Sequence, residues 1–153
     1  VAYSIFQSAL VLPTFIMNAY YPLMLKSLTG LKLVGFGLLV LSLIGTFITM
    51  IFSPMIITLL TGGGFIGSYY SLQILSLGFP AYFLSALLMW LLVTKGKYKI
   101  MFMLYTLGTI VNLLLNFIYI PRYSFIAASW VTVACEYVIL LLQILMLKSI
   151  IFK

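Results

Sequence analysis

The sequence has almost no acidic side chains and no histidine. One residue in 153 is Asp or Glu, and none is His. A zinc site needs several Cys, His, Asp or Glu ligands, and a Ser-His-Asp triad needs its histidine. The chain also lacks a P-loop and a GxGxxG fingerprint. We therefore predict no resident metal, no cofactor and no enzymatic activity.

Charged residues are scarce as well. They make up 6% of the chain, against about 25% in a typical soluble domain, and 65% of the residues are hydrophobic. Too few polar groups are present to cover a water-facing surface, so the sequence predicts an integral membrane protein. The single cysteine, Cys135, excludes a disulfide within the chain, and we expect it to be a small packing residue.

Five apolar segments are long enough to cross a bilayer, because a spanning helix needs about 20 mostly apolar residues. They cover approximately residues 3–25, 33–60, 69–94, 100–120 and 125–147. The predicted fold is all-α: one transmembrane domain over residues 1–153, built as a polytopic bundle of five spanning helices. The first segment begins at once after Val1, without the charged region of a signal peptide. We expect the chain to be a fragment of a longer protein.

The net charge of +7 comes mainly from lysines in short gaps between the apolar segments. This placement argues against a nucleic-acid partner. If all five segments span the membrane, Arg122 is the only basic residue on one side. The excess of lysine on the other side predicts that this side, with the C-terminus, is cytoplasmic. The residues on that second side are Lys26, Lys32, Lys95, Lys97, Lys99, Lys148 and Lys153.

Polar side chains inside two apolar segments are the main functional candidates. Asn112 and Asn116 lie four residues apart in the fourth segment, and Glu136, the only acidic residue, lies near the middle of the fifth. Ionisable groups at membrane depth are costly and are candidates for function by default. With no Lys or Arg expected at its depth, Glu136 is neutral, paired with Asn or Thr, or facing water. Proton or cation coupling, a contact with a substrate hydroxyl and a structural hydrogen bond are all open roles.

Polar stripes on the other segments predict either interhelical hydrogen bonds or a shared water-filled cavity. Asn18 and Gln73 are the further cavity candidates. Prolines add predicted kinks, because each leaves the carbonyl four residues earlier without its helical donor. Inside a membrane such a carbonyl needs another partner. The four kink prolines and the carbonyls they free are Pro13 with Ala9, Pro22 with Asn18, Pro54 with Met50 and Pro80 with Ser76.

A series of short motifs follows the third segment. They are Thr94-Lys95-Gly96-Lys97-Tyr98-Lys99, Asn112-Leu-Leu-Leu-Asn116, Ile120-Pro121-Arg122-Tyr123, Ala127-Ala128 and the helix from Val133 to Glu136. With these motifs, the stretch from Leu72 to Glu136 resembles the polysaccharide flippases of the multidrug/oligosaccharidyl-lipid/polysaccharide exporter superfamily. Small residues stand near Ser124 and Ala127, where members of the family usually have glycine.

The resemblance implies a two-lobe exporter fold of twelve helices, of which this chain would supply the last five. It implies translocation of an undecaprenyl-pyrophosphate-linked oligosaccharide across the cytoplasmic membrane of a prokaryote by alternating access, in the synthesis of capsule, O-antigen or lipopolysaccharide. The expected partners are that lipid-linked oligosaccharide, membrane lipids and other polysaccharide-assembly membrane proteins. Cations for the pyrophosphate are expected mainly in the other lobe. A cation-coupled multidrug exporter of the same superfamily and a non-transport membrane assembly protein are the alternatives.

Overall fold

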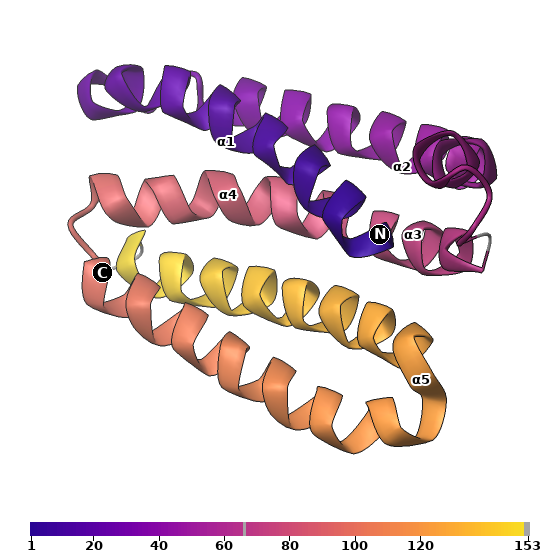
Figure 1. The fold of residues 1–153 in the computed structure, drawn as a ribbon. Coiled ribbons are helices and arrows are strands. Elements are labelled where there is room, and N and C mark those ends of the chain that lie inside the picture. Colours follow the sequence, from indigo (N-terminus) through magenta and orange to yellow (C-terminus); the bar gives the residue numbers. More distant parts are fainter. Residues whose placement is uncertain (66, 152–153) are drawn as a thin grey trace.

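The computed structural model describes residues 1–65 and 67–151, and that part of the chain contains helices and no strand. The predicted all-α fold is confirmed. Figure 1 shows the helices packed lengthwise against one another in a bundle. In chain order they are α1 (Ala2–Lys26), α2 (Leu31–Thr61), α3 (Ser68–Ser76), α4 (Phe79–Thr94) and α5 (Tyr98–Ile151).

Three of these helices, α1, α2 and α5, are each long and apolar enough to cross a membrane. The third predicted segment, residues 69–94, is not one helix, and the prediction of a continuous helix there is corrected. Helix α3 ends at Ser76, α4 begins at Phe79, and the two are bent by 46°. Pro80 lies in the first turn of α4, where a proline is tolerated, but it has no N–H to continue the hydrogen bonding from α3.

Helix α5 combines the fourth and fifth predicted segments. Ser124 alone has non-helical angles inside it, with φ 61° and ψ −160°. The gap predicted between residues 120 and 125 is therefore reduced to one residue, and the helix continues through Pro121. We call residues 98–123 the first arm and residues 125–151 the second arm of α5. Figure 1 shows the two arms folded back side by side, in orange and yellow.

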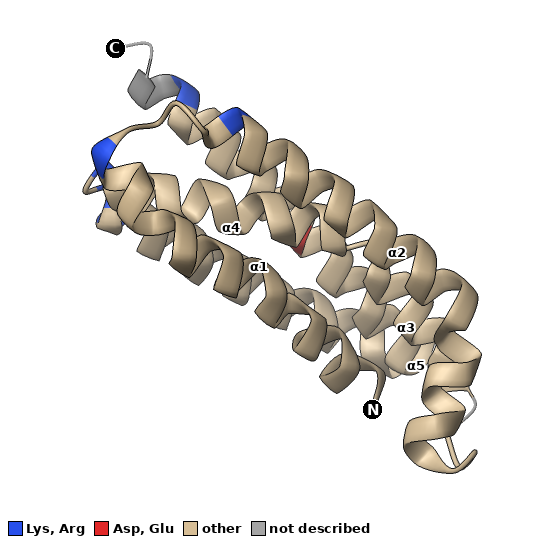
Figure 2. Cartoon of the chain, turned by 90° about the horizontal axis from the view of Figure 1, so that it is seen from above, with Lys and Arg blue, Asp and Glu red and all other residues tan. Residues whose placement is uncertain are grey.

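The basic residues lie mostly at one end of the bundle. The turn between α1 and α2, the turn between α4 and α5, and the C-terminal end of α5 are together in Figure 1. Figure 2 shows lysines, in blue, gathered at this end. The connection between α2 and α3 and the bend at Ser124, two residues after Arg122, lie at the opposite end. Lys153 falls outside the described residues.

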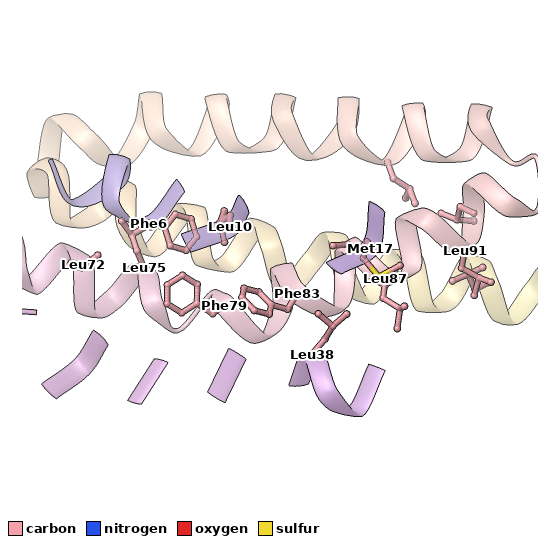
Figure 3. Close-up of a cluster of buried hydrophobic side chains, with 14 of the residues drawn as sticks. Phe6, Leu10, Met17, Leu38, Leu72, Leu75, Phe79, Phe83, Leu87 and Leu91 are labelled. Atoms are coloured by element: carbon pink, nitrogen blue, oxygen red, sulfur yellow. The ribbon is translucent and has the colours of Figure 1, made fainter. Parts of the chain in front are cut away.

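The core follows one face of α4. Phe79, Phe83, Leu87 and Leu91 are buried and recur every four residues, so they share one side of the helix. Phe79 stacks on Phe6 of α1, with ring centroids 5.5 Å apart. Figure 3 shows this row between side chains of α1 and α2. Helix α4 is thus the central element against which α1, α2 and α5 pack.

Large apolar side chains also point outward. Phe36 and Phe47 of α2 are 66% and 67% exposed, and Phe117 of α5 is 84% exposed. Exposure of such a surface to water is unfavourable, whereas contact with the hydrocarbon chains of a bilayer is not. The apolar exterior and the long apolar helices together describe a protein whose solvent is a lipid bilayer.

Candidate functional site

A cavity of ≈ 700 Å³ lies beside the two arms of α5. Its walls come from both arms, from the beginning of α1 and from α3. The cavity brings together Asn112, Asn116 and Glu136, three of the residues predicted from the sequence. Its polar lining residues are Tyr3, Ser68, Ser71, Tyr105, Thr109, Asn112, Asn116, Ser129, Thr132 and Glu136.

A second, smaller cavity of ≈ 280 Å³ lies between α1, α4 and the second arm of α5. Gln7 and Tyr82 contribute polar groups to it. Tyr3, Thr132 and Glu136 line both cavities. Glu136 therefore lies where the two spaces meet, and a group bound in either one would be close to its carboxyl.

The Glu136 carboxyl is half-buried, and among the described residues that line the two cavities it has no cation beside it. Figure 2 shows the single acidic residue, in red, well away from the basic end of the bundle. Among the described residues, no Lys or Arg lines either cavity. The groups around the carboxyl are uncharged: the hydroxyls of Tyr82 and Tyr105 lie close enough to interact with it electrostatically. The described lining thus provides no Lys or Arg to balance a negative charge at Glu136.

The two asparagines form a pair on the first arm. The Asn116 side-chain nitrogen Nδ2 donates to Asn112 Oδ1 at 2.8 Å. This leaves the buried Asn116 Oδ1 without a hydrogen-bond partner in the protein, and the Ser71 hydroxyl on α3 is likewise buried and unpartnered. Buried polar groups are normally paired. Both residues line the large cavity, so two of its walls offer hydrogen-bonding groups that the protein itself does not use.

A buried polar contact joins the two arms beside the large cavity. Gln143 is fully buried, and its Nε2 donates to the Tyr105 hydroxyl at 3.3 Å. At Gly108, an added Cβ would come within 2.6 Å of Ile139 Cδ1, so the absent side chain allows the arms to approach closely. These contacts fix the second arm, and with it Glu136, against the first.

The other two predicted cavity residues lie elsewhere. Asn18 is exposed on α1 and is not among the residues lining either cavity. Gln73 is on α3, and its Nε2 donates to the Met50 carbonyl on α2 at 3.0 Å. The contact of Gln73 is therefore an interhelical hydrogen bond.

Two of the carbonyls freed by proline have partners on a neighbouring helix. Met50, which lacks the helical donor at Pro54, accepts from Gln73. Ser76, which lacks the donor at Pro80, accepts from the Thr46 hydroxyl at 2.8 Å. The Leu77 carbonyl, inside the break between α3 and α4, accepts from the Tyr137 hydroxyl of α5 at 3.0 Å. The remaining kink prolines, Pro13 and Pro22, lie within α1, which continues through both.

Sequence reasoning missed several contributors to the large cavity, among them Tyr105, Tyr3 and Ser71. Tyr105 had a usable signal, because it precedes Gly108, Asn112 and Asn116 at steps of three and four and so shares their helix face. Tyr3 and Ser71 had none, since their place in the wall depends on how α1 and α3 pack against α5.

Comparison of the chain with protein-family models, with curated proteins and with solved structures gave no match. The class that fold and site define is an all-helical membrane protein with a polar cavity containing one carboxyl group.

Proposed function

We propose that the chain is the C-terminal part of a polysaccharide flippase, which moves an undecaprenyl-pyrophosphate-linked oligosaccharide across the cytoplasmic membrane of a prokaryote. The observation that carries this proposal is the convergence of Asn112, Asn116 and Glu136 on one cavity. These residues belong to the stretch that resembles the flippases. Asn116 Oδ1 also has no partner in the protein, so this wall of the cavity retains an unused hydrogen-bond acceptor.

The proposed topology has five spans: α1, α2, the bent pair of α3 and α4, and each arm of α5. The pair of α3 and α4 passes the length and hydropathy requirements when taken together. Each arm, at about 1.5 Å per residue, exceeds the hydrocarbon thickness of about 30 Å. The lysine-rich end is the cytoplasmic one by the positive-inside rule, which puts the C-terminus in the cytoplasm and the bend at Ser124 outside.

The broken helices support alternating access. Transporter sites are typically built from discontinuous helices whose segments move against each other. The 46° break between α3 and α4 adjoins the large cavity through Ser71 and Leu75 of α3. A change in the angle of this break would alter the cavity wall and leave the core of α4 in place.

The substrate's pyrophosphate does not fit the described cavities. Two phosphate groups at membrane depth need cations or several N–H donors around them. The described lining offers no Lys or Arg, and Glu136 would repel the phosphates. In the proposed complete transporter, the phosphates are therefore held by the other lobe.

Deletion of the complete gene tests the proposal. We expect the mutant strain to lose its surface polysaccharide and to accumulate lipid-linked oligosaccharide on the cytoplasmic side of the membrane. A plasmid carrying the complete gene should restore the polysaccharide. Intact surface polysaccharide in the deletion strain would refute the flippase function.

A cation-coupled multidrug exporter of the same superfamily is the second candidate. It is favoured by the single carboxyl at the junction of two cavities, with Tyr3 and Tyr82 nearby, because a carboxylate and aromatic rings suit an organic cation. The variant Glu136→Gln distinguishes the two. Loss of drug resistance with unchanged surface polysaccharide would select the exporter.

A further inference from the structure

The lining of the ≈ 700 Å³ cavity indicates which part of a lipid-linked oligosaccharide it would hold. We propose that this cavity binds an uncharged sugar portion of the substrate, and that Glu136 excludes sugars carrying an acidic group. The inference rests on the proposed flippase function and deepens it, because it gives the class of ligand that this part of the transporter selects.

Neutral hydrogen-bonding groups dominate the polar lining. A sugar hydroxyl both donates and accepts, so it matches amides and hydroxyls equally well. Ser71 on α3 and Asn116 on the first arm of α5 provide unpartnered atoms from two different walls. A ligand hydroxyl that reached either atom would supply its missing hydrogen-bond partner. An apolar ligand would leave both unsatisfied, at a cost of about 1–3 kcal/mol for each group.

Aromatic side chains complete the match to a sugar. Tyr3, Phe65, Tyr105 and Phe125 line the same cavity from α1, the connection before α3, and both arms of α5. A sugar ring has an apolar face of C–H groups, and this face packs on aromatic rings. The volume also falls within the range of about 300–1,000 Å³ that is usual for small-molecule sites.

Charge then sets the selectivity. The carboxyl of Glu136 is the single acidic group among the described lining residues of both cavities. A uronic acid bound there would bring a second carboxylate close to it with no cation to compensate, and like charges sharing a site destabilise each other. A built-in repulsive group is a common means of rejecting a wrong ligand. Glu136→Gln removes the ionisable carboxyl at nearly constant shape.

Thiol protection in the complete transporter, reconstituted in lipid nanodiscs, tests the inference. Cys135 lines the cavity and is changed to Ser, and any other cysteines are removed. Thr109→Cys then places a thiol in the cavity wall, and Tyr98→Cys places a control thiol at the exposed basic end. The rate of labelling by a water-soluble methanethiosulfonate is measured with cellobiose, with cellobiouronic acid or with tetraphenylphosphonium.

We expect cellobiose to slow labelling at Thr109→Cys severalfold and to leave Tyr98→Cys unchanged. Cellobiouronic acid should not protect, and adding Glu136→Gln should make it protect as well as cellobiose does. Equal protection by both sugars before Glu136 is changed would overturn the selectivity. Protection by tetraphenylphosphonium alone would overturn the sugar site in favour of an organic cation.

The gene deletion separates this inference from the flippase function. No sugar protection, together with loss of surface polysaccharide in the deletion strain, would overturn the sugar site and leave the flippase in place. Selective protection by cellobiose with intact surface polysaccharide would support the site and refute the flippase.

Discussion

The side-chain amide of Gln73 donates to the backbone carbonyl of Met50 at 3.0 Å, and Met50 is the residue whose helical donor is replaced by Pro54. The amide thus occupies the place of a missing backbone N–H across a helix interface. In the same way, the Thr46 hydroxyl of α2 donates at 2.8 Å to the Ser76 carbonyl of α3, whose helical donor is replaced by Pro80. Helices α2 and α3 are therefore joined by two reciprocal hydrogen bonds, each to a carbonyl that a proline has freed.

These bonds predict a specific double-mutant result. Gln73→Leu leaves the Met50 carbonyl unpaired, so we expect a loss of about 1–3 kcal/mol in the free energy of unfolding. Pro54→Ala supplies a backbone N–H to the same carbonyl, so Gln73→Leu should cost much less in that background. Thermal unfolding of the purified protein in detergent measures both. Equal losses with and without Pro54 would contradict the assignment. Leu59→Ala, at a side chain of α2 that is 72% exposed, is the control and should have the same small effect in both backgrounds.

The bend of α5 predicts that glycine is better than the natural residue at Ser124. Its angles, φ 61° and ψ −160°, lie in a region that is nearly restricted to glycine and costs other residues about 1–3 kcal/mol. Ser124→Gly should therefore raise the Tm. The matched control is Ala134→Gly in the helical second arm, where we expect a loss of about 1 kcal/mol. A fall in Tm for both variants would show that the backbone at Ser124 is not strained.

The close approach of the arms makes Gly108 sensitive to size. A Cβ at this position would lie 2.6 Å from Ile139 Cδ1 and 2.9 Å from its Cγ1, so the Ile139 side chain must move. We expect Gly108→Ala to destabilise the protein by about 1–3 kcal/mol, and Ile139→Ala to reduce the additional cost of that change. Gly37→Ala meets no atom within 4 Å and should be neutral or stabilising. Thermal unfolding of Gly108→Ala, Ile139→Ala, the double variant and Gly37→Ala measures these effects. An unchanged Tm for Gly108→Ala would argue against close packing of the arms.

The sequence was sufficient for features that depend on composition and on single helices. The apolar excess predicts a helical membrane protein, and the spacing of Asn112 and Asn116 puts both on one face. The freed carbonyl of Met50 also follows from the position of Pro54 alone. Its partner does not, because the contact with Gln73 depends on how α2 and α3 are placed in space.

Two local features were not fully predicted, for physical reasons. The sequence predicts a kink at Pro80, but hydropathy is continuous across Gly78 and carries no sign that the segment divides there into two helices, α3 and α4. The bend at Ser124 was also hidden, because a left-handed φ is expected at glycine and seldom at serine. Asn18 and Gln73 were predicted as cavity residues together with Glu136 for a similar reason. The position of a residue along its helix can be read from the sequence, whereas the direction of its side chain relative to neighbouring helices cannot.

The different positions of Asn116 and Asn18 give a functional prediction. Asn116 lines the large cavity and Asn18 does not. Asn116→Leu removes one neutral hydrogen-bonding group, worth about 0.5–1.5 kcal/mol, so substrate affinity should fall about 2- to 10-fold. Restoration of surface polysaccharide in the deletion strain, at low expression of the variant, measures the effect. Asn18→Leu at matched membrane abundance should restore the polysaccharide fully, and an equal defect in both variants would mean that the cavity has no special part in transport.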